Sequence, residues 1–124
     1  MSRVLLVEDH VMNRLLAREL LEHRGHEVVD AHNVLEARLR LTEPPFDVVL
    51  LDIQIPGGGG VAVLDHIRAT PSLAKLPVIA VTAQAMSGDR ERLLATGFDG
   101  YVSKPIDTKT FGETVESFLG RTAP

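Results

Sequence analysis

Residues 48–56 read Val48-Val49-Leu50-Leu51-Asp52-Ile53-Gln54-Ile55-Pro56. Four consecutive apolar residues indicate a strand that is buried on both faces, as in a parallel sheet. The run stops at Asp52, and because an unpaired charge is costly to bury, this carboxylate is expected at the C-terminal end of the strand. Pro56 and the glycines after it indicate that the strand has ended. Ligands of open α/β sheets bind at this edge, which makes Asp52 a candidate nucleophile.

Apolar runs alternate with helical patterns along the whole chain. Further strands are expected at residues 4–7, 28–29, 78–81 and 101–102, and helices at about residues 12–24, 34–43, 61–70, 87–96 and from 108 onward. Parallel strands need crossover connections, which right-handed helical units supply. The pattern therefore predicts an α/β fold, with a doubly wound parallel sheet of five strands and with five helices on its two faces.

Caps and apolar faces are predicted for the helices. Asn33 with Glu36 has capping-box spacing, while Ser87 and Asp107 are expected to cap the fourth and fifth helices. The spacing of the leucines predicts inward-facing stripes in the first two helices, formed by Leu15, Leu16, Leu20 and Leu21 and by Leu35, Ala37, Leu39 and Leu41. In the last helix the inward residues are expected to be Phe111, Val115, Phe118 and Leu119.

The bulk composition restricts the class of protein. The chain has 124 residues, of which 44% are hydrophobic and 24% charged, with a formal net charge of −4, as expected for one globular domain. It contains no cysteine, which excludes disulfides and thiolate metal sites and makes the cytoplasm the expected location. No signal peptide or membrane-spanning run is recognisable. The absence of a basic stripe argues against nucleic-acid binding.

Polar residues follow four of the predicted strands at one edge of the sheet. Glu8 and Asp9 come after the first strand, Asp52 and Thr82 end the third and fourth, and Lys104 follows the fifth. Neighbouring carboxylates repel one another unless a cation neutralises them, and Mg²⁺ is the expected ion for oxygen-only ligands. Mg²⁺ and Lys104 together would clamp a phosphoryl group, for which a carboxylate is an accepted nucleophile. The sequence thus predicts phosphoryl transfer to Asp52.

The chain resembles the receiver domain of two-component response regulators. The resemblance rests on four motifs in this order and spacing: Glu8-Asp9, Leu51-Asp52, Val81-Thr82-Ala83 and Lys104-Pro105. It covers essentially the whole chain, and residues 77–105 are most similar to single-domain receivers of the DivK type and to the receivers of hybrid histidine kinases. It implies a flavodoxin-like sheet with strand order 2-1-3-4-5 and one receiver domain over residues 1–124, without an output domain.

The resemblance also implies roles in phosphoryl binding. Asp52 accepts the phosphoryl group from a phosphohistidine. Lys104, the Thr82 hydroxyl and the Ala83 N–H hold phosphoryl oxygens. Tyr101 is the switch aromatic, with simple core packing as the alternative.

A magnesium site is implied as well, with Mn²⁺ as the alternative ion. Asp9 and Asp52 bind the metal directly, Glu8 binds it through water, and the carbonyl of Gln54 completes the protein ligands. The bond before Pro105 is expected to be cis.

The glycine run at residues 57–60 departs from the family pattern. Many receivers carry an aspartate where Gly59 stands. We therefore expect the helix after Asp52 to lack a side-chain cap.

The resemblance implies a monomeric switch that reports its phosphorylation by binding another protein. The expected phosphodonor is a histidine kinase or a histidine phosphotransfer protein. The expected reporting surface comprises the helix at residues 87–95, the strand of Tyr101 and the last helix. Such a switch catalyses its own phosphorylation and dephosphorylation and is not an enzyme acting on external substrates.

Two other functions are weighed against the switch. A phosphohydrolase of the haloacid-dehalogenase type would need an aspartate as general acid two residues after Asp52, where Gln54 stands. A phosphorelay shuttle, which passes the phosphoryl group on to a histidine protein, is the second alternative.

Overall fold

Five parallel strands form one sheet, in the order β2-β1-β3-β4-β5, in the computed structural model, which describes residues 2–83 and 88–119. The strands are β1 Arg3–Val7, β2 Glu27–Ala31, β3 Val48–Asp52, β4 Val78–Thr82 and β5 Gly100–Ser103. The predicted fold class and strand order are both confirmed.

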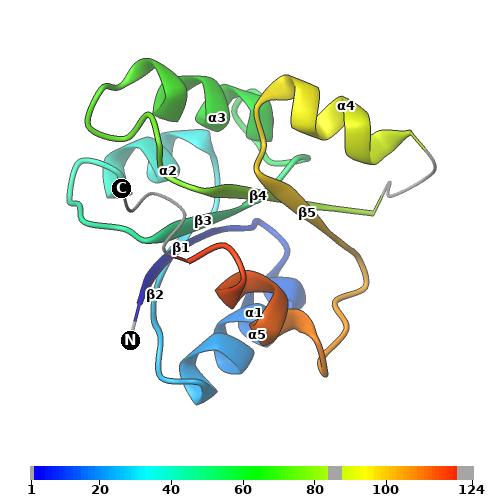
Figure 1. Ribbon diagram of the computed structural model, residues 1–124. Coiled ribbons are helices and arrows are strands. Elements are labelled where there is room, and N and C mark those ends of the chain that lie inside the picture. Colours follow the sequence, from blue (N-terminus) through cyan, green and yellow to red (C-terminus); the bar gives the residue numbers. More distant parts are fainter. Residues whose placement is uncertain (1, 84–87, 120–124) are drawn as a thin grey trace.

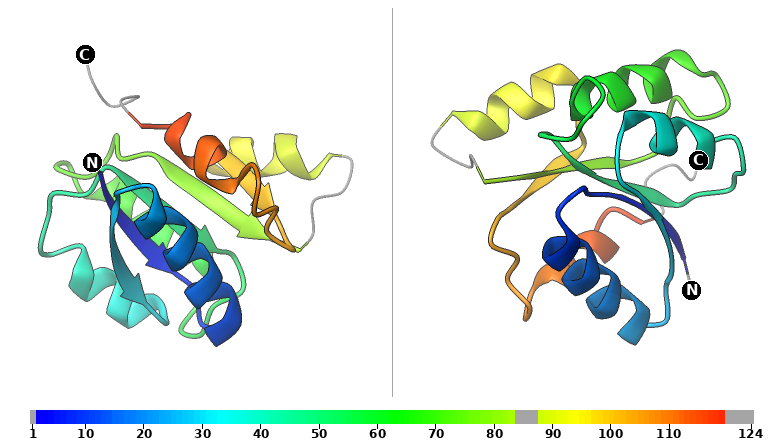
Figure 2. Two further views of the ribbon diagram at one scale, coloured as in Figure 1. Left: turned by 90° about the horizontal axis from the view of Figure 1, so that it is seen from below. Right: turned by 180° about the vertical axis from the view of Figure 1, so that it is seen from behind.

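Helices cover both faces of the sheet (Figure 1). They are α1 Val11–His23, α2 Val34–Arg40, α3 Gly60–Ala69, α4 Asp89–Thr96 and α5 Phe111–Glu116. Helices α2, α3 and α4 lie on one face and α1 and α5 on the other, as the view from behind in Figure 2 also shows. No helix in the described part of the chain combines the length and the apolar character needed to cross a bilayer.

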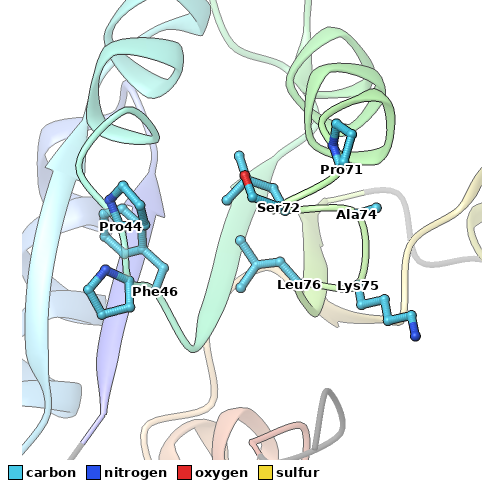
Figure 3. Close-up of a pocket in the computed structure, with 9 residues that line it drawn as sticks. Pro44, Phe46, Pro71, Ser72, Ala74, Lys75 and Leu76 are labelled. Atoms are coloured by element: carbon cyan, nitrogen blue, oxygen red, sulfur yellow. The ribbon is translucent and has the colours of Figure 1, made fainter.

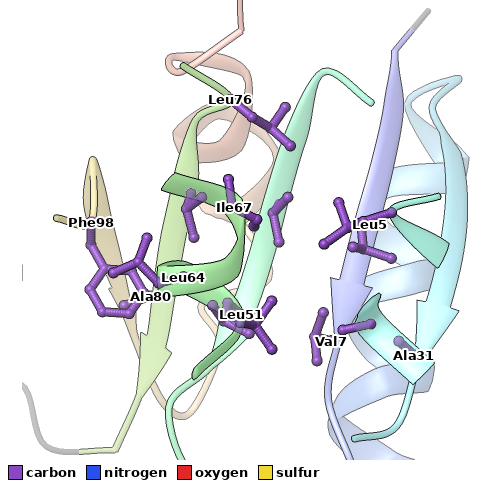
Figure 4. Close-up of a cluster of buried hydrophobic side chains, with 14 of the residues drawn as sticks. Leu5, Val7, Ala31, Leu51, Leu64, Ile67, Leu76, Ala80 and Phe98 are labelled. Carbon is purple, nitrogen blue, oxygen red and sulfur yellow. The ribbon is translucent and has the colours of Figure 1, made fainter. Parts of the chain in front are cut away.

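Alternate residues of the central strands supply two hydrophobic cores. Leu5, Val7 and Leu51 pack with residues of α2, α3 and α4 (Figure 4). Their neighbours Val4 and Leu6 point the other way and pack with α1 and α5. Since side chains alternate along a strand and both faces are covered, residues 4–7 of β1 and 48–51 of β3 all favour apolar side chains. This is why the strands read as continuous apolar runs.

The predicted inward faces of α1 and α2 are partly wrong. Leu15, Leu35 and Leu39 are exposed to solvent. In α2 the buried positions are instead Val34 and Ala37, and in α1 they are Ala17 and Leu21. Apolar residues occur on two sides of each helix and only one side faces the sheet, so apolar spacing alone does not mark the buried stripe.

The helix caps agree with prediction at α2 and differ at α5. Asn33 Oδ1 accepts the Glu36 N–H at 2.8 Å, which confirms the predicted N-cap. Helix α5 begins only at Phe111, with Thr110 as its N-cap. Asp107 initiates the turn before it, since its side chain accepts the Lys109 N–H at 2.9 Å. Ser87 lies outside the described residues.

The last helix is also shorter than predicted. Helix α5 ends at Glu116, and Phe111 and Val115 are its buried large residues. Phe118 and Leu119 follow the helix and are only partly buried, packed against the core beneath α1 and α5.

Candidate functional site

The register of the sheet aligns the ends of its strands. Val7 pairs with Leu51, so the residue after β1, Glu8, lies level with Asp52. On the other side of β3, Asp52 pairs with Val81, the residue before Thr82. Polar side chains that are far apart in sequence therefore meet at the C-terminal edge of the sheet, as the sequence predicts.

Asp52 is the buried centre of this edge, with only 5% of its surface exposed. Its Oδ2 accepts a hydrogen bond from the Lys104 ammonium at 2.8 Å. Its Oδ1 accepts the N–H of Gln54 at 3.0 Å, while the Gln54 side chain is exposed. The carboxylate is thus buried with a partner for each oxygen, as burial of a charge requires.

Glu8 shares the ammonium with Asp52. The distance from Lys104 Nζ to Glu8 Oε1 is 3.1 Å, and Glu8 Oε2 accepts the His10 N–H at 3.2 Å. Burial, aided by the neighbouring Asp52, raises the pKa of Glu8 to about 7. Burial alone would lower the pKa of Lys104, but its hydrogen bonds to Asp52 and Glu8 outweigh that effect and raise it.

Three carboxylates converge at the site. Oxygens of Glu8, Asp9 and Asp52 all lie within 4.8 Å of one another, and Asp9 is exposed at the rim. One ammonium cannot balance three carboxylates, and oxygen-only donors match a hard divalent cation. The donor set and its excess negative charge therefore fit a magnesium-type ion.

The remaining predicted residues border the same edge. Thr82 is buried at the end of β4, and its carbonyl accepts the Lys104 N–H at 2.8 Å. Ala83 follows and is exposed. Tyr101 is half-buried and packs against the core under α2, α3 and α4. The Lys104–Pro105 peptide bond is cis, as is Pro44–Pro45.

Glycine is required in the loop between β3 and α3 (residues 53–59). The N-cap of α3 is Gly59, with φ of 82° and no side-chain cap, which confirms the prediction for this helix. The next residue, Gly60, donates its N–H to the Ile53 carbonyl at 2.7 Å. A Cβ atom on Gly60 would lie 2.6 Å from the Asp52 carbonyl oxygen. The loop thus turns back so tightly that a side chain at residue 60 would displace the backbone of Asp52.

Two contacts at the site were missed by sequence reasoning. The Arg14 guanidinium donates to the Glu8 carbonyl at 3.2 Å. The Val34 N–H at the start of α2 donates to the Pro56 carbonyl at 3.0 Å. In both, the acceptor is a backbone carbonyl. Because every residue has such a carbonyl, the amino-acid sequence does not indicate which one accepts the bond.

A cavity of about 360 Å³ lies at the opposite edge of the sheet (Figure 3). Its walls come from the segments that precede β3 and β4, including Pro44, Phe46, Pro71 and Leu76. Among the described residues of its lining, Lys75 alone is ionisable, and its side chain points away from Pro44 and Phe46 (Figure 3). The described lining of this cavity therefore lacks the converging charged groups that the C-terminal edge of the sheet provides.

Comparison with known proteins agrees with this geometry. Residues 4–116 match the model of the response regulator receiver domain. The polar-differentiation response regulator DivK of Brucella anthropi is 43% identical over 117 residues, which are 94% of this chain and 95% of that protein. DivK of Brucella ovis is 42% identical over the same length.

Solved structures share the fold across nearly the whole chain. A chemotaxis response regulator of Vibrio cholerae aligns with a TM-score of 0.89 at 25% identity, covering 96% of this chain and 99% of that one. The receiver domain of a sensor histidine kinase from Pseudomonas aeruginosa, solved with a magnesium ion in its active-site cleft, aligns with a TM-score of 0.86 at 28% identity, covering 96% and 98%. The family match and the DivK relatives together establish that the chain belongs to the response regulator receiver domains, the signalling domains of two-component systems.

Proposed function

We propose that this protein is a single-domain phosphorylation switch in which Asp52 accepts a phosphoryl group from a phosphohistidine. The observation that carries the proposal is the buried Asp52 carboxylate, bonded to Lys104 at 2.8 Å and flanked by Glu8 and Asp9. The near-complete overlap with DivK, 95% of that protein's length, supports one receiver domain over residues 1–124. The absence of cysteine supports a cytoplasmic location.

We propose Mg²⁺, or Mn²⁺ in its place, as the cofactor. Asp9, Asp52 and the Gln54 carbonyl would hold the ion, with Glu8 reaching it through water. When bound, the ion neutralises charge on the carboxylates and on the incoming phosphoryl oxygens. The 4.8 Å grouping of carboxylate oxygens supports this assignment, as does the magnesium ion of the related Pseudomonas aeruginosa receiver.

The transfer itself asks little of the protein beyond positioning and electrostatics. One Asp52 oxygen forms a bond to phosphorus as the phosphorus–nitrogen bond of the phosphohistidine breaks, and the imidazole leaves with the bonding electron pair. Lys104, already at the Asp52 carboxylate, moves to a phosphoryl oxygen. The Thr82 hydroxyl and the Ala83 N–H bind the other phosphoryl oxygens. Attack of water on the phosphorus of the aspartyl phosphate releases inorganic phosphate and regenerates Asp52, which resets the switch.

The phosphodonor is a histidine kinase or a histidine phosphotransfer protein. A donor protein must contact the rim of the pocket to bring its histidine to Asp52. Val11, Met12 and Leu15 expose apolar side chains at the start of α1, which begins two residues after Asp9. Exposed apolar residues beside a reactive site are typical of a protein-binding surface.

The output is phosphorylation-dependent protein binding to the face formed by α4, β5 and α5, which we call the output face. A groove of about 500 Å³ runs between these elements, and its lining includes Arg90, Leu94, Tyr101 and Phe118. Tyr101 links this groove to the core. A Tyr101 ring that moves between two packings would therefore change the groove.

Labelling separates this function from the alternatives. The protein is incubated with acetyl phosphate and Mg²⁺, and incorporated phosphate and released phosphate are both measured. Stoichiometric, chelator-sensitive label is expected. Rapid phosphate release without retained label would instead indicate a hydrolase. Quantitative transfer of the label from Asp52 to a histidine phosphotransfer protein, without any effect of phosphorylation on the binding of other proteins, would indicate a shuttle.

A further inference from the structure

Helix α2 carries an apolar stripe that the fold leaves exposed. Leu35 and Leu39 expose 68% and 58% of their surface. They lie four residues apart, and Arg38 lies three residues from Leu35, so all three share one face of the helix. The adjacent face of the helix, with the buried Val34 and Ala37, supplies the core contacts. The stripe is therefore not needed for folding, and its exposure favours a role in binding.

Basic residues flank this apolar stripe, although the protein is acidic overall. Among the described residues, neither Arg38 nor Arg40 forms an ion pair. Arg40 Nε donates to the Asp30 carbonyl at 3.1 Å. The Glu36 carboxylate on the same helix accepts the His32 N–H at 2.8 Å. Two guanidinium groups without an ion pair among the described residues thus border the leucines, although the whole chain has a net charge of −4.

We propose that Leu35, Arg38 and Leu39, with Arg40 at the edge, form a docking surface for an acidic amphipathic helix of a partner protein. Two leucines one turn apart on a convex helix match the apolar face of a second helix. Aspartate or glutamate residues flanking that face would pair with Arg38 and Arg40. Such a partner complements both the shape and the charge of the stripe.

This surface is separate from the two surfaces assigned above. Helix α2 lies on the opposite face of the sheet from α1, and α3 lies between α2 and α4 (Figures 1 and 2). It is nevertheless joined to the signalling site. The Val34 N–H bonds to Pro56, and a Cβ atom on Gly57 would lie 3.1 Å from Val34 Cβ. An occupant of the stripe would therefore bind a helix whose first residue contacts the loop after Asp52.

Two synthetic helical peptides test the proposal on the full chain. One has leucines at i, i+3, i+4 and i+7 with glutamates on both flanks, and the other has lysines in place of the glutamates. The acidic peptide should shift the amide NMR signals of residues 34–41. Leu35→Ser and Leu39→Ser should each weaken its binding about tenfold or more. Arg38→Glu should reverse the preference toward the lysine peptide. Leu94→Ser, at an exposed leucine of α4, is the matched control and should leave the affinity unchanged.

Several outcomes would overturn the proposal. The proposal fails if neither peptide binds or if both bind equally well. It also fails if the shifts of the amide NMR signals are confined to α1 or to the output face. Unchanged affinity in folded Leu35→Ser and Leu39→Ser variants would do the same. Self-association of the wild type that is lost in Leu35→Ser would assign the stripe to a second copy of this chain instead. Because the titration uses unphosphorylated protein, its failure is distinguishable from failure of the phosphorylation switch.

Discussion

The Lys104 ammonium bridges two buried carboxylates, at 2.8 Å from Asp52 Oδ2 and 3.1 Å from Glu8 Oε1. Lys104 follows β5, whereas the carboxylates lie at the ends of β1 and β3. The bridge therefore ties three strands together at the proposed site of phosphoryl transfer. A compact ammonium fits between the two carboxylate oxygens. Phosphorylation of Asp52 would directly alter the contacts of the Lys104 ammonium.

Lys104→Arg should impair signalling although it keeps the charge. The guanidinium is a larger planar fork than the ammonium and cannot occupy the same position between Asp52 and Glu8. Labelling by acetyl phosphate should persist, while the phosphate-dependent gain in affinity for a partner of the output face should fall by about an order of magnitude. Lys109→Arg, at an exposed lysine outside the pocket, is the control. A normal gain in Lys104→Arg would contradict the assigned role.

Met12→Ser and Leu15→Ser should slow phosphotransfer from a histidine phosphotransfer protein by about tenfold. Both side chains are exposed beside the pocket, so the changes remove contact area without disturbing Asp52. Labelling by acetyl phosphate, which needs no docking, should be unchanged. Leu94→Ser serves as the control on a different face. Equal slowing with both donors would mean that these residues act on the chemistry and not on docking.

Without metal, stability should fall as the pH rises from about 5 to about 8. The pKa of Glu8 is raised from 4.5 to about 7, chiefly by burial and then by Asp52. The folded state thus holds this proton more tightly than the unfolded state, so the stabilisation is complete below the unfolded pKa and is lost as the pH passes the folded one. The loss should be on the order of 2 kcal/mol.

Urea denaturation in chelator at a series of pH values measures this dependence. Glu8→Gln should flatten the profile, because it removes the titrating carboxyl group. Millimolar Mg²⁺ should flatten it too, because a bound cation favours ionised Glu8. If the wild-type profile in chelator rises through this window, the raised pKa of Glu8 is wrong.

Thr82→Ala should separate phosphorylation from its output. The nucleophile and the carboxylates remain, so labelling should be retained, but the hydroxyl that follows the phosphoryl group is lost. The coupling to partner binding, typically about 1–3 kcal/mol, should largely disappear. Tyr101→Ala should do the same by removing the moving ring. Thr42→Ala, at an exposed threonine after α2, should keep the coupling. Full coupling in both site variants would show that the signal leaves Asp52 by another route.

The sequence predicted the sheet better than the helix faces. Continuous apolar runs such as Val48–Leu51 occur because both sides of a central strand are covered, and few other arrangements of a short segment produce this pattern. In α2, by contrast, Leu35 and Leu39 recur at the same period as the buried Val34, Ala37 and Leu41. Periodicity identifies a helix but does not decide which of two adjacent apolar stripes faces the sheet.

The candidate site was predictable because its residues end a strand, as Asp52 and Thr82 do, or closely follow one, as Glu8 and Lys104 do. Ion pairs between distant elements could not be predicted from the sequence. Arg68 binds Asp99 at 2.8 Å, 31 residues away, and Arg24 binds Glu116 at 2.6 Å across 92 residues. Arg24 also lies over Gly112, where a Cβ atom would meet its side chain. Such pairs depend on how helices and turns are brought together, and no local pattern encodes them.

Asp52, and no other carboxylate of the site, is proposed to receive the phosphoryl group. Borohydride reduction of the labelled protein converts an aspartyl phosphate to homoserine, which mass spectrometry locates in the sequence. We expect a single Mg²⁺-dependent conversion at Asp52 that is absent from Asp52→Asn, while Asp65→Asn, a change at an exposed aspartate on α3, leaves it intact. Conversion at Asp9, or undiminished labelling of Asp52→Asn, would contradict it.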